Sequence, residues 1–312
     1  RLVDGEISAV LARARQLLRS DLPDDLAGIL VATSASAAAA VTGDRELLDE
    51  AAVVGGLTAD RVPTVIPGFG LADFQVLGHR LAGTPERGAD LARRMRAASA
   101  DLPGPARLMG LVVAGHAALA EGRLLDALLS LREAWAALEG SGHEFRFRCR
   151  TLLATALAQA GRPESAAPLL AGVAAGHHPA YRLYLPDDRL ALAWGAAAEG
   201  WTTEAIGHAV AAADLAREAG SPAYEVLAWQ TAVQLGDTTV APARRLAPLA
   251  GLGPRADTAL AHARAWADED GDALLRVAHA WARLGDLVAA GDAAARAAEV
   301  HRRAGRQGSA LT

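Results

Sequence analysis

One glycine recurs along the sequence at nearly constant intervals, and this repeat constrains the fold more than any other feature. Five residues after it, six of the seven side chains are Gly or Ala, and seven residues before it five of the seven are small. A glycine can end a helix with positive φ, and small residues let two antiparallel helices cross closely. The pattern therefore predicts an all-α solenoid of antiparallel helix pairs, about 7 repeats with a period of about 39. The recurring residues are Gly43, Gly83, Gly122, Gly161, Gly200, Gly236 and Gly285, at intervals of 40, 39, 39, 39, 36 and 49.

The composition favours helices throughout. Alanine supplies much of the 52% of hydrophobic residues, aromatics amount to only 4%, and alanine is the strongest helix former. The last interval of 49 residues leaves room for an additional helix near 254–268. The predicted helices span 5–19, 24–41, 44–54, 71–82, 85–100, 105–121, 124–139, 144–160, 163–175, 186–199, 202–219, 222–235, 239–250, 254–268, 270–284 and 286–304.

Two connections in this prediction are long, 55–70 and 172–187, and they are interpreted as inter-repeat loops, with a functional role as the alternative. The repeats up to Gly83 match the pattern least well. The sequence DLPGP at 101–105 would interrupt a helix. We therefore divide the chain into more divergent repeats at 1–104 and regular repeats at 105–312, and expect one continuous superhelix.

Several classes of chemistry are excluded by residues that the chain lacks. It contains no lysine and no asparagine, which fits a GC-rich coding sequence, and so it has no phosphate-loop or Schiff-base lysine. A net charge of −5 and a pI near 6.0 argue against direct contact with nucleic acid. The single cysteine, Cys149, excludes an internal disulfide, and its helical, apolar neighbours predict a buried structural thiol.

No catalytic or metal-binding motif stands out. GxSxG and HExxH are absent, and the pair His177-His178 has no further ligand at a suitable spacing. The acidic run at 268–272 lacks the twelve-residue pattern of a calcium loop and is interpreted as a solvated turn. We therefore expect no enzyme activity, no cofactor and no metal.

No segment of the sequence resembles a signal peptide, and its most apolar stretch, Gly28 to Val41, is interpreted as a buried helix. These features predict a cytoplasmic protein without membrane contact. The sequence starts at Arg1 without methionine and stops at Thr312 in a helix-like segment, so we expect a piece of a longer protein.

Counted from the recurring glycine, the pattern has a small residue at −7, Gly at 0, Ala at +5 and Ala at +12. This pattern resembles the tetratricopeptide repeat, most clearly in GHAALAEGRLLDALLSLREAW at 115–135. In that family, positions two, three, six, ten and thirteen before the glycine face a concave groove. Here the −6 positions of five repeats are polar or amphipathic, which is typical of a binding groove, although a solvated polar face is the alternative. The resemblance thus implies a ligand-binding set of His116, Arg148, Thr151, Thr155, Asp187, Trp194 and Gln230.

The final stretch, AARAAEVHRRAGRQGSALT at 294–312, resembles the end of the helical region in large actinobacterial LuxR-type transcription regulators of the STAND and maltose-regulator kind. The resemblance implies a sensing and autoinhibitory region, coupled to an ATPase module and a helix-turn-helix domain outside these residues. Its partner would be a small-molecule effector or a partner protein in the concave groove, with homo-oligomerisation through the parent protein. The alternative is a tetratricopeptide protein–protein interaction scaffold without a small-molecule ligand, for which the groove should be open and strongly charged.

Overall fold

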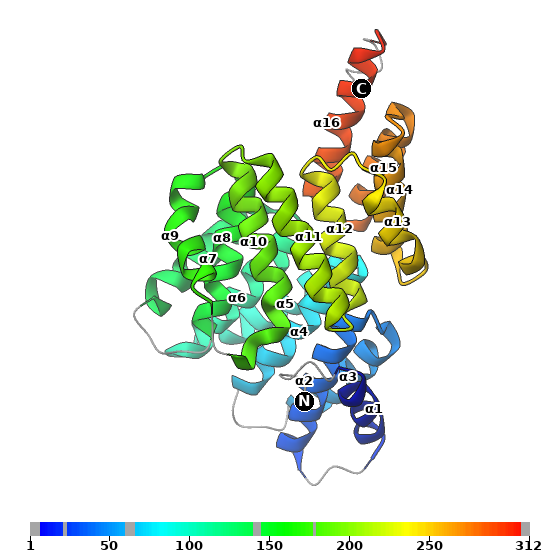
Figure 1. Ribbon diagram of the computed structural model, residues 1–312. Helices are drawn as coiled ribbons and strands as arrows, with labels where there is room; N and C mark the ends of the chain where they lie inside the picture. Colours follow the sequence, from blue (N-terminus) through cyan, green and yellow to red (C-terminus); the bar gives the residue numbers. More distant parts are fainter. Residues whose placement is uncertain (1–6, 21–23, 60–65, 140–144, 177–178, 307–312) are drawn as a thin grey trace.

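The computed structural model describes residues 7–20, 24–59, 66–139, 145–176 and 179–306, and within these ranges it is helical without any strand. Its elements follow one another as helical hairpins (Figure 1). The helices are α1 (Ile7–Leu18), α2 (Asp25–Thr42), α3 (Arg45–Ala59), α4 (Ile66–Ala82), α5 (Pro85–Ser99), α6 (Pro105–Ala120), α7 (Leu124–Leu138), α8 (Phe145–Gln159), α9 (Pro163–Ala174), the 3-10 helix η1 (Pro179–Tyr184), α10 (Leu185–Ala198), α11 (Thr202–Glu218), α12 (Pro222–Gln234), α13 (Ala241–Leu246), η2 (Ala247–Leu249), α14 (Pro254–Ala267), α15 (Gly271–Leu284) and α16 (Leu287–Arg303).

The recurring glycines end the first helix of each hairpin, as the repeat pattern predicts. All seven have positive φ, between 66° and 107°. Small residues allow the two helices of a hairpin to cross closely: a Cβ on Gly115 of α6 would lie only 2.4 Å from Leu131 Cγ of α7. The sequence prediction of an all-α repeat array is confirmed, including the extra helix α14 in the longest interval.

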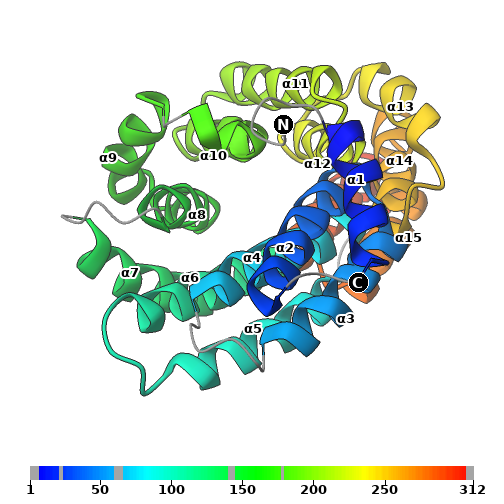
Figure 2. The ribbon, with the colours of Figure 1, turned by 90° about the horizontal axis from the view of Figure 1, so that it is seen from below.

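The hairpins are arranged around a ring (Figure 2). The first helices of the pairs, α2, α4, α6, α8, α10 and α12, pack on one another in order and form an inner layer. The second helices, α3, α5, α7, α9 and α11, lie outside them. α12 also contacts α2 and α4, and α14 contacts α4, so the array coils back onto its own beginning.

The C-terminal segments cover the hairpin turns of the first repeats. A Cβ on Gly43 would lie 2.9 Å from Leu252 Cγ, and one on Gly83 would lie 2.9 Å from the backbone nitrogen of Arg255. The backbone N–H of Leu287 donates to the carbonyl of Glu121 over 3.2 Å. The start of α16 therefore sits directly on the turn between α6 and α7.

The predicted loop at 55–70 is wrong for most of its length. α3 continues to Ala59 and α4 begins at Ile66, while 60–65 lie outside the described residues. Gly55 lies inside α3, where close packing against α4 leaves no room for a side chain: a Cβ on Gly55 would come within 2.3 Å of Leu71 Cδ2. The segment 172–187 is also shorter as a loop than predicted, since η1 occupies 179–184 and α10 starts at Leu185; His177 and His178 lie outside the described residues.

By length and composition, α2 is the one helix among the described residues that is apolar enough to cross a membrane, with a mean hydropathy of 1.5. In the fold 56% of this helix is buried. It packs against α1, α3, α4 and α12. Its place in the inner layer accounts for its apolar sequence.

Two glycines at the same repeat position test whether the start of α16 packs on the turn between α6 and α7. Gly122→Ala and Gly161→Ala both place Ala at positive φ, which costs about 1 kcal/mol. Only at Gly122 would the new Cβ clash, 2.8 Å from the backbone nitrogen of Val288, whereas Gly161 faces open space. We expect Gly122→Ala to lower the free energy of unfolding by at least about 1 kcal/mol more than Gly161→Ala in urea denaturation. Equal losses would contradict this packing.

Candidate functional site on the inner face

The seven residues predicted to line a groove all lie on helices of the inner layer. His116 is on α6, Arg148, Thr151 and Thr155 are on α8, Asp187 and Trp194 are on α10, and Gln230 is on α12. Six of them are buried and Trp194 is half-buried. The inner face is therefore packed against itself, and these side chains meet one another in its interior.

Arg148 is the centre of this interior. Its Nε donates to Asp73 Oδ2 over 3.0 Å, and its Nη1 donates to Asp187 Oδ2 over 2.7 Å. Its guanidinium carbon lies 4.5 Å from the centre of the Tyr184 ring. With an exposed fraction of 2%, this arginine is sealed from solvent while it joins α4, α8 and α10.

Further buried groups complete the arrangement around the two carboxylates. The His116 ring lies 2.8 Å from Asp73 through Nδ1, and the Tyr184 hydroxyl donates to Asp73 Oδ2 over 3.3 Å. The Tyr224 hydroxyl of α12 donates to Asp187 Oδ2 over 3.0 Å, and Arg80 Nη1 of α4 donates to Asp187 Oδ1 over 3.1 Å. We call this set the inner-face network: Asp73, Arg80, His116, Arg148, Tyr184, Asp187 and Tyr224.

The charges of the network balance. Burial alone would raise the pKa of Asp187, but the charges of Arg80 and Arg148 outweigh it and lower that pKa to about 2. Burial likewise opposes ionisation of Asp73, and the charge of Arg148 nevertheless holds its pKa well below the usual range. Burial and the charge of Arg148 lower the pKa of His116. Two arginines thus face two carboxylates, with a neutral histidine beside them.

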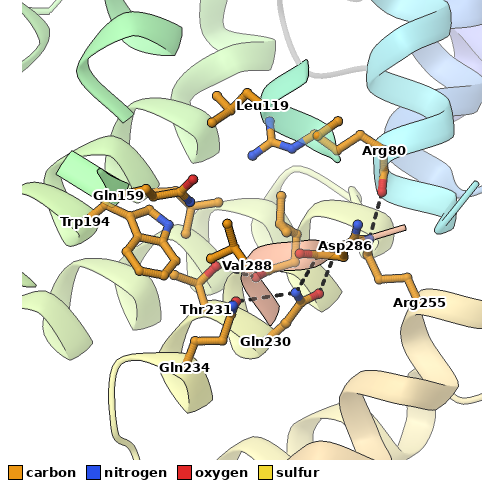
Figure 3. Close-up of a pocket in the computed structure, with 13 residues that line it drawn as sticks. Arg80, Leu119, Gln159, Trp194, Gln230, Thr231, Gln234, Arg255, Asp286 and Val288 are labelled. Carbon is orange, nitrogen blue, oxygen red and sulfur yellow. Dashed lines mark hydrogen bonds and ion pairs between the residues drawn. The ribbon is translucent and has the colours of Figure 1, made fainter. Parts of the chain in front are cut away.

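A second buried cluster lies where α14 and α16 cover the inner layer (Figure 3). Arg255 donates through Nη1 to Gln230 Oε1 and to Asp286 Oδ2, over 2.6 and 2.8 Å. Its Nε donates to the carbonyl of Arg80 over 2.7 Å. Asp286 also caps α16, because its Oδ1 accepts from the N–H of Ala289. One side chain thus ties the C-terminal helices to α4 and α12.

Beside this cluster is a cavity of about 30 Å3, into which Trp194, Gln230 and Thr231 point (Figure 3). A space of this size holds one or two waters and is far smaller than the pockets that enclose small molecules. In this conformation this cavity therefore offers no room for an effector.

The two threonines of the predicted set have local partners. The Thr151 hydroxyl donates to Asp188 Oδ1 over 2.8 Å, and the Thr155 hydroxyl donates to the carbonyl of Thr151 over 2.9 Å. Thr151 therefore joins α8 to α10, and Thr155 bonds within α8. Neither hydrogen bond involves the inner-face network.

Sequence reasoning missed both network members on α4 and the two tyrosines, Tyr184 and Tyr224. Asp73 and Arg80 stand ten and three residues before Gly83, which are groove-facing positions in the tetratricopeptide pattern. Applying the same rule to the divergent second repeat would have found both. Arg255 lies in the additional helix α14 and has no equivalent position in the repeat.

Two other kinds of site considered from the sequence are a metal site and a reactive cysteine. Among the described residues, no group of three or more His, Cys, Asp or Glu side chains is placed to hold a metal ion. Cys149 is buried and its thiol lies 3.5 Å from the carbonyl of Leu131, as its apolar neighbours predict. Burial raises the pKa of this thiol to about 12, which keeps it protonated.

The chain has a tetratricopeptide-like all-α repeat fold. Its architecture resembles the crystal structure of a Rap protein complexed with competence and sporulation factor, at a TM-score of 0.52 and 12% sequence identity. The similarity covers 98% of this chain and 95% of the Rap chain. No model of a protein family matches the sequence, and no curated protein matches it significantly. At this identity the Rap similarity establishes the fold alone.

Removing the central guanidinium should be severely destabilising. Arg148→Met keeps the unbranched apolar stem of the side chain but leaves Asp73 and Asp187 buried without their main cation. We expect a loss of about 3–5 kcal/mol in the free energy of unfolding, measured in urea. Arg276→Met, at an exposed arginine of α15, is the matched control and should change stability by less than about 0.5 kcal/mol. A loss at Arg148 no larger than the control's would refute the central role of this residue.

The network should also contribute to the acid sensitivity of the protein. Because the folded pKa of Asp187 is about 2 and its ordinary value is 3.8, the stabilisation is fully present above pH 3.8 and is lost as pH falls towards 2. Asp187→Asn lacks this titration, so its stability deficit relative to the wild type should shrink by about 2 kcal/mol between pH 5 and pH 2. Urea unfolding at a series of pH values measures the deficit, and a deficit independent of pH would show that Asp187 is not held ionised.

Proposed function

We propose that these 312 residues form the effector-sensing, autoinhibitory region of a cytoplasmic LuxR-type transcription regulator. The region catalyses no reaction itself. It binds a small molecule or a partner protein on its inner face and transmits this event to an ATPase module and a helix-turn-helix domain elsewhere in the parent protein.

The observation that carries this proposal is the inner-face network. It joins the inner helices through ion pairs and hydrogen bonds, so opening the array would expose groups that water solvates well. Breaking buried ion pairs on opening is partly offset by the hydration of the freed charges. Such a contact suits an equilibrium between a closed and an open array, which a ligand can shift by binding one of them more tightly.

Effector binding then requires the open state. The 30 Å3 cavity beside Trp194 and Gln230 is too small for an effector, so a ligand must displace the contacts that close the face. An effector with groups that replace the partners of Arg148 and Asp187 would do so. The apparent affinity would be lowered in proportion to the rarity of the open state.

Two comparisons support this reading. A Rap protein of similar fold and length was solved in a complex with competence and sporulation factor, so an array of this kind is able to hold a partner. The resemblance of residues 294–312 to LuxR-type regulators supplies the transcriptional context. The scaffold hypothesis instead needs an open, charged groove on the inner face, and that face is closed here.

The proposal predicts which domains flank these residues and how a variant of the full protein affects transcription. The reading frame should encode a GxxxxGK loop followed by Ser or Thr upstream of Arg1, and a helix-turn-helix segment downstream of Thr312. In the full protein, Arg148→Met should raise transcription of its target promoter in the absence of effector, while Arg276→Met should not. A frame that encodes a catalytic or membrane domain in these places would refute the regulator assignment.

A further inference from the structure

The outer surface carries a hollow of about 380 Å3 lined by residues of α7, α8 and α9. We call it the outer groove. Its apolar lining includes Leu153, Leu157 and Leu169, with Trp135 and Pro168 at its sides. It lies on the side of α8 that the inner-face network does not use. Its volume falls within the range of pockets that enclose single small molecules, about 300–1,000 Å3.

Three arginines line the outer groove, against one acidic residue. Arg132 comes from α7, Arg146 and Arg150 come from α8, and Glu139 is the acid. None of these arginines forms an ion pair with a residue that the structure describes. Several other surface arginines are paired with carboxylates, for example Arg87 with Asp49 over 2.8 Å. In a chain with a net charge of −5, three arginines against one acidic residue give this groove a local excess of positive charge.

Arg150 is the least satisfied of the three. Its Nε is buried and has no hydrogen-bond partner among the described residues. Burial lowers the pKa of Arg150; the charge of Asp188 opposes this effect and that of Arg146 adds to it. An anion in the groove would therefore stabilise a charge that the fold leaves poorly solvated.

The backbone makes room for Arg150 in this position. α9 presents Gly172 to the arginine, and a Cβ on Gly172 would lie 2.9 Å from Arg150 Nη1 and 3.1 Å from its Cδ. Beside it, the guanidinium of Arg146 lies 6.0 Å from the centre of the Trp135 ring. Cationic donors and a flat aromatic wall thus face the same space.

We propose that the outer groove binds a small organic anion that carries a carboxylate on a flat, apolar body. The guanidinium groups match a carboxylate in shape and charge, because arginine presents parallel N–H donors to its two oxygens. Trp135 and the leucines provide the surface for the apolar body. The site is separate from the inner face and does not depend on the proposed regulatory function.

The test uses the whole chain with 2-naphthoate and its uncharged twin, 2-naphthamide, in isothermal titration calorimetry. We expect saturable binding of 2-naphthoate in the millimolar range or tighter, and binding of 2-naphthamide that is at least about tenfold weaker. Arg150→Gln should weaken 2-naphthoate binding about tenfold or more. Arg276→Gln, which removes an exposed charge on α15, should leave the affinity unchanged.

Arg132→Gln provides a second, independent variant, because Arg132 is exposed and its replacement cannot disturb the core. It should also weaken 2-naphthoate binding, with an unchanged melting temperature. Three results would overturn the proposal: no saturable binding of 2-naphthoate, equal affinity for the acid and the amide, or binding that neither Arg132→Gln nor Arg150→Gln weakens. None of these results bears on the inner-face network, so the two proposals fail independently.

Discussion

The closed form of this array depends on the pairing of Arg148 with Asp73 and Asp187. Each of the three residues comes from a different inner helix, and burying any one of them alone would cost several kcal/mol. The arrangement is stable only when α4, α8 and α10 are in register together. Buried ion pairs contribute little net stability compared with apolar packing, but they penalise wrong arrangements strongly. The network therefore specifies how the ring closes, while alanines and leucines between the helices supply the stabilising burial.

The sequence predicted the repeat architecture well because its signals are local. A glycine with positive φ and small residues at crossing points act within one hairpin, so helices from α5 to α12 and the extra helix α14 were placed closely. The inner face was identified for the same reason, since a position relative to the glycine fixes which way a side chain points. What the sequence could not show is that this face closes. Contacts such as Arg80 with Asp187 join residues more than a hundred positions apart, and no periodicity encodes them.

The two faces of α8 show how one helix serves different environments. Arg148 and Arg150 stand two positions apart on the helix, with Cys149 between them, and therefore point in different directions. The first is buried among carboxylates that hold its charge, and the second is half-buried, with a buried Nε that has no hydrogen-bond partner among the described residues. In sequence they form one basic stretch around Cys149. Only the position of the neighbouring helices distinguishes a structural guanidinium from one that remains available to a ligand.

The packing of the C-terminal helices on the first hairpin turns changes the way this chain should respond to damage. A linear solenoid unfolds from its ends, because each repeat contacts only its neighbours and the outermost ones are held on one side. Here the segments that begin α14 and α16 rest on the turns after Gly83 and Gly122, so the two ends protect each other from fraying. Such an array is a closed ring of contacts, whereas a linear solenoid has two free ends. Loosening of either end should therefore destabilise the opposite end, and the two should unfold in a single cooperative transition.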